Sequence, residues 1–227
     1  MKQEPAPAAV REAFPDAIEQ LEVLHERLAT TGVERGLIGP REVPRLWDRH
    51  ILNCAVVTEL IPESAQELAD VGSGAGLPGL VLAVLRPTMS VTLIEPLERR
   101  SLFLSEVVDE MDLGNRVEVL RARAEDVRGR QFAVVTARAV APLDRLCGWC
   151  LPLLAPGGRL LAIKGARAYE EVAAAQQTLA TKNFRVELCG HGIIDPPTTV
   201  VVLDVAGSTH SHPTAAHQRN DRQLKQG

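Results

Sequence analysis

A glycine-rich stretch directly follows a short apolar run in the segment ELADVGSGAGLPGL, residues 67–80. Glycine adopts positive φ angles and lets a ligand approach the backbone closely. In open α/β sheets, ligands bind beyond the carboxyl ends of the strands. The segment therefore predicts a cofactor-binding loop between a strand that ends at Val71 and a helix that begins near Pro78, since proline suits a first helical turn.

The glycines of this loop can be read in two registers, which point to different cofactors. Gly72, Gly74 and Gly76 form one register, and Gly74, Gly76 and Gly79 form the G-x-G-x-x-G pattern of dinucleotide folds. Glu95 is predicted to end the second strand, where a carboxylate accepts hydrogen bonds from a ribose diol. Both NAD and S-adenosylmethionine (SAM) carry an adenosine ribose, so these residues alone leave the cofactor open.

Three further features favour SAM over NAD. Asp70 directly precedes the loop, where its carboxylate is placed to meet the amino-acid end of SAM, directly or through water, and would repel the pyrophosphate of NAD. Ala124, Glu125 and Asp126 follow the third predicted strand, a usual place for contacts to an adenine. The segment LLAPGGRLLAIKG, residues 153–165, resembles the helix, Pro-Gly-Gly turn and fifth strand of class I SAM-dependent methyltransferases. The first glycine register is therefore preferred, and Gly79 becomes a packing residue of the following helix.

The elements that must position these residues alternate between strands and helices. Strands are predicted at 67–71, 90–95, 116–121, 132–137, 159–163, 184–189 and 199–205. Helices are predicted at 78–86, 97–111, 142–154 and 168–181. The last two strands have no helix between them, so they form an antiparallel pair. The expected fold is α/β: a Rossmann-like, class I SAM-methyltransferase fold whose seven-stranded sheet is mainly parallel with an antiparallel last strand.

A helical extension is predicted before this domain. Apolar residues recur at helical spacing over 14–28 and over 42–61, while residues 1–10 are rich in Ala and Pro and are predicted to be loose. We expect three parts, which are an N-terminal helical extension at 1–62, the methyltransferase domain at 63–206 and a disordered polar tail at 207–227.

Composition excludes several classes of protein. The chain has 227 residues, a net charge of −4 and only 3% aromatic residues, which argues against a protein that coats nucleic acid non-specifically or by stacking. No apolar run approaches the length of a membrane span, so a soluble, cytoplasmic protein is expected.

Cys147 and Cys150 share a helix face with Leu146 and Leu153 and are interpreted as core residues. No metal site is expected.

The sequence shows no nucleophile, metal cluster or general base for methyl transfer. Methylation of an exocyclic base amine usually goes with an (N/D)-P-P-(Y/F) segment after the fourth strand, but residues 134–142 read VVTARAVAP. Carbon-5 methylation of a pyrimidine requires a cysteine nucleophile, and the cysteine pair lies inside a predicted helix. Guanine N7 carries an in-plane lone pair and no proton, so its methylation requires positioning in a desolvated pocket instead of a base.

Five motifs then follow in an order that is typical of one family. They are LWDRHILNC (46–54), DVGSGAGLPGL (70–80), RAEDV (123–127), ARAVAPL (137–143) and AIKG (162–165). Over residues 14–205 the chain resembles the bacterial small-subunit rRNA guanine-N7 methyltransferases, also called the glucose-inhibited division protein B family. The resemblance implies methylation of one guanine N7 in 16S rRNA with SAM, and we expect a monomer that acts on a 30S particle or an assembly intermediate. It also implies cofactor contacts at Gly72, Leu77, Ala124, Glu125 and Arg138.

Basic residues are the candidates for contacts to the methyl donor and to RNA. Arg138 is predicted to end the fourth strand beside the cofactor and is the candidate catalytic residue, holding the carboxylate of SAM or contacting the guanine or its phosphate. A structural ion pair is the alternative. Lys164, at the end of the fifth strand, and Arg45, Arg49 and His50, on the second N-terminal helix, are candidate RNA contacts. A solvated strand end or helix face is the alternative for each.

Two other functions remain open from the residues alone. A small-molecule SAM-dependent methyltransferase of the same fold is favoured by the acidic net charge and the few aromatic residues. An NAD-binding reductase would use the second glycine register.

Overall fold

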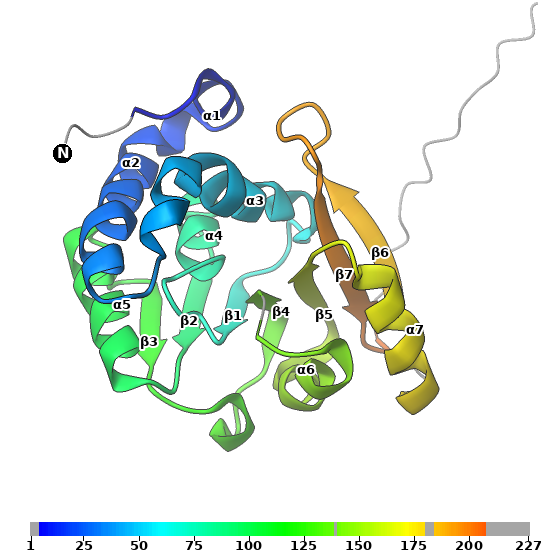
Figure 1. Cartoon of the computed structure of the whole chain (residues 1–227). Coiled ribbons are helices and arrows are strands. Elements are labelled where there is room, and N and C mark those ends of the chain that lie inside the picture. Colours follow the sequence, from blue (N-terminus) through cyan, green and yellow to red (C-terminus); the bar gives the residue numbers. More distant parts are fainter. Residues whose placement is uncertain (1–4, 139, 180–183, 208–227) are drawn as a thin grey trace, which may run out of the picture.

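The sheet has the predicted topology. The computed structural model describes residues 5–138, 140–179 and 184–207, and its strands form one seven-stranded sheet in the order β3-β2-β1-β4-β5-β7-β6 (Figure 1). The strands are β1 (Glu67–Val71), β2 (Ser90–Ile94), β3 (Val117–Leu120), β4 (Phe132–Arg138), β5 (Leu154–Lys164), β6 (Phe184–Cys189) and β7 (Thr198–Asp204). Strands β1 to β5 pair in parallel, and β7 is antiparallel to β5 and β6. The predicted fold class is confirmed.

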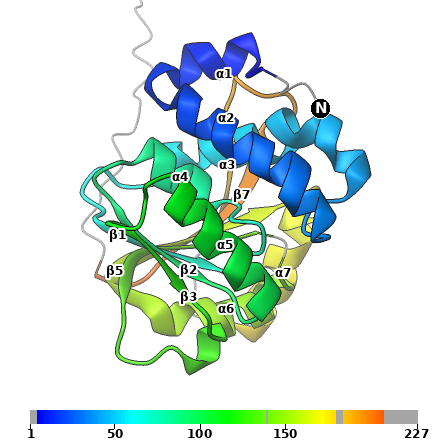
Figure 2. The same cartoon turned by 90° about the vertical axis from the view of Figure 1, so that its left-hand side faces the viewer.

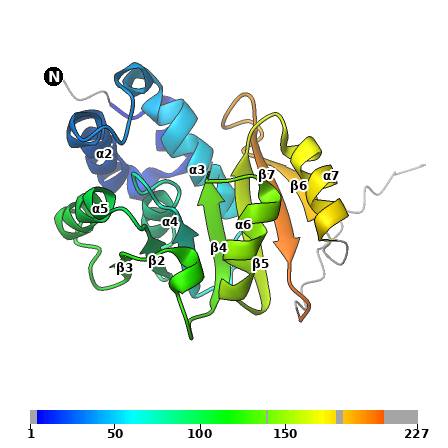
Figure 3. The ribbon, with the colours of Figure 1, turned by 60° about the horizontal axis from the view of Figure 1, so that its bottom comes forward.

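Helices cover both faces of the sheet (Figures 1 and 3). They are α4 (Gly79–Leu85) and α5 (Glu98–Glu110) on one face, and α6 (Leu143–Cys150) and α7 (Ala168–Thr178) on the other. Alternate strand residues supply the two cores, with Leu68 in the first and Ala69 in the second. Cys147 and Cys150 are buried in the second core, as predicted. The predicted end of the last helix, at residue 181, lies outside the described residues.

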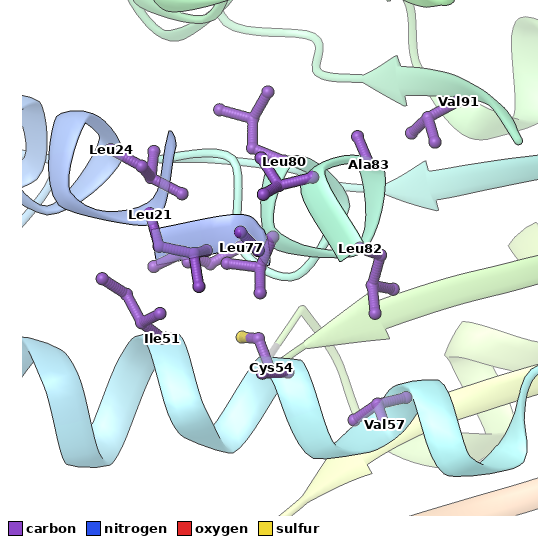
Figure 4. Packing of buried hydrophobic residues seen from close by; sticks show 14 of the residues in the cluster. Leu21, Leu24, Ile51, Cys54, Val57, Leu77, Leu80, Leu82, Ala83 and Val91 are labelled. Atoms are coloured by element: carbon purple, nitrogen blue, oxygen red, sulfur yellow. The ribbon is translucent and has the colours of Figure 1, made fainter. Parts of the chain in front are cut away.

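The N-terminal helices share the first core with α4 and α5 (Figure 2). Leu21 and Leu24 of α2 (Ile18–Arg27) are fully buried there, together with Ile51 and Cys54. Figure 4 shows Ile51, Cys54 and Val57 on one side of their helical stretch, facing Leu77 and the leucines of α4. The two predicted apolar stripes are therefore confirmed as core contacts, and they dock the extension on the methyltransferase sheet.

The predicted continuous helix over 42–61 is wrong in detail. The chain instead forms a 3-10 turn at Pro40–Arg45, a π-helical stretch at Leu46–Leu52, a short α-helix, α3 (Asn53–Ala55), and another 3-10 turn at Val56–Leu60. Pro44 lies inside the first of these segments. Proline has no N–H to donate, which accounts for an irregular start at this position. It does not account for the π-helical and later 3-10 stretches, which lie beyond it.

Two other boundaries also differ from the prediction. The region predicted to be loose contains α1 (Ala8–Ala13), because Val10 is buried in the first core and Arg11 pairs with Glu22 at 2.7 Å. Strand β5 begins at Leu154, so the Pro-Gly-Gly segment is a bulge inside the strand instead of a turn before it. The predicted disordered tail after residue 207 lies outside the described residues.

Candidate active site

The glycine loop between β1 and α4 has the backbone that the first register requires. Gly72, Gly74 and Gly76 have φ angles of 69°, 57° and 87°, values that L side chains rarely adopt. A Cβ at Gly76 would lie 2.3 Å from Cδ1 of Leu80, so this glycine also permits packing. A Cβ at Gly74 would meet only one atom, 3.8 Å away. Gly74 therefore leaves open space beside the loop.

Gly79 is a packing residue, as predicted. A Cβ at Gly79 would lie 2.3 Å from Cδ2 of Leu93 and 2.7 Å from Oδ2 of Asp70. Its N–H donates to Oδ2 of Asp70 at 3.0 Å. The last glycine of the dinucleotide register therefore joins α4 to β1 and has no room for a bound phosphate.

Asp70 lies beneath the loop and is fully buried. Besides the Gly79 amide, it accepts a hydrogen bond from Oγ1 of Thr136 on β4 at 3.1 Å, and its carbonyl accepts one from Ser73 at 2.9 Å. Burial raises the pKa of Asp70 to about 6. Asp70 is not among the residues that line the cleft described next, and its predicted place near the amino-acid end of SAM, directly or through water, stays a prediction.

A cleft of about 820 Å³ opens at the carboxyl edge of β1, β2 and β4. Such a volume suits a nucleoside-sized ligand. The predicted site residues that line it are Gly72, Gly74, Leu77, Glu95, Ala124, Glu125, Arg138 and His50. Those that do not line it are Asp70, Gly76, Arg45, Arg49 and Lys164. The structure thus brings together residues that lie far apart in the sequence.

Glu95 directly follows β2 and lines the cleft next to the glycine loop. Its side chain is 2% exposed, and its two oxygens accept N–H donors from Gly74 and Leu97, each at 2.9 Å. The guanidinium of Arg100 lies 3.9 Å away. Each carboxylate oxygen can accept a second hydrogen bond, so Glu95 retains acceptor sites for the hydroxyls of a ribose.

Arg138 ends β4 inside the cleft. Its Nη2 donates to Nδ1 of His50 at 2.7 Å and its Nη1 donates to Sγ of Cys54 at 3.4 Å. No carboxylate of the described residues forms an ion pair with it. The structural ion pair that was its alternative role is therefore not seen in the described part of the chain, and the guanidinium charge is available to an anion.

His50 is turned into the cleft, away from the exposed Arg45 and Arg49. Its Nε2 lies 3.0 Å from Oε2 of Glu42. Burial lowers the pKa of His50, and the charges of Arg138 and Arg49 lower it further, while the hydrogen bond that His50 makes to Glu42 and the charge of Glu42 oppose this shift. The three cations predicted as one RNA-facing patch are thus divided between a surface pair and a cleft residue.

Lys164 is held inside the protein. Its side chain is 6% exposed, and Nζ donates to the carbonyl of Ala141 and to Oε2 of Glu171, both at 2.7 Å. Glu171 also accepts the N–H of Leu143. These bonds fix the segment that follows β4, instead of presenting a free cation at the sheet edge.

Sequence reasoning missed some residues that line the cleft. Trp149 of α6 is one of them, with the Arg145 guanidinium 5.0 Å from its ring centroid. Leu97, which is half exposed, and residues 37–39 also line it. The only sequence signal for Trp149 is its rarity, since the chain has two tryptophans.

The sheet order, the glycine loop and the acidic residue at the end of β2 define a class I SAM-dependent methyltransferase. Solved structures agree on the fold. A SAM-dependent methyltransferase from Aquifex aeolicus covers 74% of this chain and 100% of its own, with a TM-score of 0.55 and 18% identity. PigF, solved with SAH, covers 86% of this chain and 64% of its own, with a TM-score of 0.56 and 16% identity.

Sequence comparisons give the particular family. Residues 17–192 match the GidB family, described as rRNA small subunit methyltransferase G. The enzyme of that name from Salinispora tropica is 55% identical over 205 residues, which cover 86% of this chain and 84% of the relative. The enzyme of the same name from Thermobifida fusca is 52% identical over 218 residues, which cover 94% of this chain and 91% of the relative. The chain belongs to this family.

The chain is accordingly a SAM-dependent methyltransferase of guanine in 16S rRNA. The family result sets aside both the NAD-binding reductase and the small-molecule methyltransferase that the residues alone left open. No helix among the described residues is long and apolar enough to cross a membrane.

Proposed function

We propose that the methylated atom is N7 of one guanine in 16S rRNA. The observation that carries the proposal is the bonding of the two side chains beside Arg138. Nδ1 of His50 accepts from Arg138, and Nε2 of His50 is bonded to Glu42. With one ring nitrogen accepting from Arg138 and the other holding its proton toward Glu42, His50 is not free to take a proton from a substrate. Guanine N7 has no proton to lose, so a site of this kind can methylate it by positioning alone.

The cofactor roles follow from the lining of the cleft. Glu95 would accept hydrogen bonds from the ribose hydroxyls, and Gly74 would let the cofactor lie against the loop. Ala124 and Glu125 would face the adenine, and Arg138 would bind the carboxylate of the methionine part. When bound, SAM supplies an electrophilic methyl group on a sulfonium. The chain's own residues orient this group and exclude water around the acceptor nitrogen.

Asp70 and Lys164 take positioning roles in this proposal. The Asp70 carboxylate joins the loop to α4 and β4, and the Lys164 ammonium joins β5 to the segment after β4. Neither group would touch the cofactor or the RNA. The exposed Arg45 and Arg49, close in sequence to His50, would instead contact RNA phosphates.

We further propose that the enzyme acts as a monomer in the cytoplasm, on a 30S particle or an assembly intermediate. Aromatic residues make up only 3% of the chain, and sequence-specific readers of single-stranded RNA rely on such rings for stacking. A target guanine presented by folded rRNA and ribosomal proteins would need less recognition by the enzyme itself.

The test uses labelled SAM with two acceptors, free 16S rRNA and 30S particles that lack the modification. N7-methylguanine is detected as chain cleavage after borohydride reduction and aniline treatment. We expect label and cleavage at one guanine, with faster transfer to the particle. Label without cleavage would place the methyl group on another atom and refute the N7 assignment. Equal or faster transfer to free rRNA would refute the preference for a particle.

A further inference from the structure

The cleft contains a chain of three polar side chains that joins the N-terminal extension to the sheet. Oε2 of Glu42 lies 3.0 Å from Nε2 of His50, and Nδ1 of the same ring lies 2.7 Å from Nη2 of Arg138. All three residues line the cleft. We propose that His50 is a positioning residue that aims the Arg138 guanidinium at its anion, and that Glu42 fixes the tautomer of His50 for this purpose. The inference rests on the proposed function of Arg138 as the anion contact.

The hydrogen-bond donors and acceptors allow one assignment of the His50 protons. A guanidinium only donates, so Nδ1 of His50 must accept and the ring must be neutral. The remaining proton is then on Nε2, where it donates to the carboxylate of Glu42. Glu42 therefore selects the tautomer that leaves Nδ1 free for Arg138.

Arg138 has little else to hold it. Among the described residues, its other hydrogen-bond partner is the thiol of Cys54, at 3.4 Å, and a thiol is a weak acceptor. The Cys54 side chain is fully buried, and burial raises the pKa of its thiol, so it stays uncharged. An arginine side chain has several rotatable bonds. His50 is thus the strong restraint on the guanidinium in the described residues.

The arrangement makes the site sensitive to acid. Protonation of His50 would turn its acceptor into a donor and set a second cation against Arg138. The charged groups that face His50 are Glu42 on the preceding turn, Arg49 on its own stretch and Arg138 on β4. Burial and the two arginines lower the pKa of His50 below its ordinary value, which keeps the ring neutral at pH 7.

Asp70 interacts electrostatically with Arg138 and titrates in a nearby range, because burial raises its pKa to about 6. An acid limb in the activity profile therefore has two possible sources. Replacing His50 by a residue that does not titrate separates them, since the contribution of Asp70 remains in the variant.

The experiment compares His50→Ala and His50→Asn with Arg138→Ala. In asparagine the carbonyl oxygen is bonded to Cγ, as Nδ1 is in histidine, so the acceptor for Arg138 is restored without a titratable ring. His191→Ala, at an exposed histidine in the loop between β6 and β7, is the matched control. Each variant is measured by calorimetry with SAH, by kcat and KM for methyl transfer, and by thermal unfolding.

We expect His50→Ala to weaken SAH binding or lower kcat/KM by about tenfold to a hundredfold, the usual range for a hydrogen bond to a charged group. His50→Asn should recover most of this loss. It should also lack the decrease in activity at acid pH that is caused by protonation of His50. Glu42→Gln keeps an acceptor for Nε2 and should show a smaller loss. His191→Ala should behave as the wild type.

The double variant His50→Ala with Arg138→Ala decides between positioning and an independent role. A positioning residue adds no further loss once Arg138 is absent. Additive losses, no recovery in His50→Asn, or a loss of activity matched by a loss of stability would overturn the inference. If Arg138→Ala itself binds SAH and turns over normally, the proposed function of Arg138 fails. If only Arg138→Ala is impaired and His50→Ala is not, the positioning role alone fails.

Discussion

Replacement of Gly74 by valine tests the cofactor loop most directly. The residue has a φ of 57°, and a Cβ built on it meets only the carbonyl oxygen of Gly72, at 3.8 Å. A side chain at Gly74 therefore fills space in the cleft without striking the protein. The left-handed backbone costs roughly 1–2 kcal/mol for an L residue, with more for a β-branched one. This remains well below the 5–15 kcal/mol that holds a typical domain folded.

Gly76 provides the matched control because its φ is also positive, at 87°. There a Cβ would lie 2.3 Å from Cδ1 of Leu80 and 2.8 Å from its Cγ, inside the core. Overpacking adds about 1–3 kcal/mol to the backbone strain. Gly76→Val should therefore lose mainly stability, whereas Gly74→Val should lose mainly ligand binding.

Urea unfolding and calorimetry with SAH measure the two effects separately. We expect Gly74→Ala to weaken SAH binding at least about tenfold, equivalent to about 1.4 kcal/mol, and Gly74→Val to abolish it while the protein still unfolds cooperatively. A folded Gly74→Val protein that binds SAH as the wild type does would refute the reasoning, because the loop would then be only a turn between β1 and α4.

Three other perturbations test separate parts of the site. Trp149 lines the cleft and Trp47 is buried outside it, so SAH should change the fluorescence of Trp47→Phe but not that of Trp149→Phe; the reverse result would remove Trp149 from the site. Burial raises the pKa of Asp70 to about 6 from an ordinary value of 3.8, which means that the folded state holds its proton more tightly than the unfolded chain does. The free energy of unfolding should therefore fall as pH rises from about 4 to 6, by on the order of 3 kcal/mol, and Asp70→Asn should not show this fall; equal pH dependence in both proteins would contradict the assignment. Lys164→Met leaves the carboxylate of Glu171 without its cation and should lower stability by about 2 kcal/mol, measured by urea unfolding, with RNA affinity of the folded protein unchanged; a selective loss of RNA binding would restore the predicted phosphate contact.

Periodicity and glycine chemistry predicted most of the fold because they act locally. Six of the seven strands both begin and end within one residue of the predicted positions. The exception is β5, where pairing with β4 extends the strand through Gly157 at a φ of 81°. A Pro-Gly-Gly segment is typical of a turn, and only the neighbouring strand shows that it is a bulge.

Side-chain direction could not be predicted in the same way. Arg45, Arg49 and His50 lie at helical spacing, but the proline-interrupted 3-10 and π-helical geometry around them changes which face each one occupies. Lys164 ends its strand as predicted, yet the nearby Glu171 on α7 holds it in an ion pair. Spacing along one element identifies candidate cations, but packing between elements decides which of them stays free.

The contacts that the sequence could not predict are in the part of the site that the fold class does not specify. The loop and Glu95 belong to the sheet, and their roles follow from features that many cofactor-binding α/β folds share. Glu42 and His50 come from the extension, 96 and 88 residues before Arg138 in the chain. The contact of His50 with Arg138, which Glu42 supports through His50, depends on the apolar docking of Ile51 and Cys54 against α4. Because this docking brings the two halves of the cleft together, a change that loosened it would separate His50 from Arg138 while leaving the glycine loop intact. The extension is therefore a structural part of the cleft, and the end of the cleft at Arg138 depends on it.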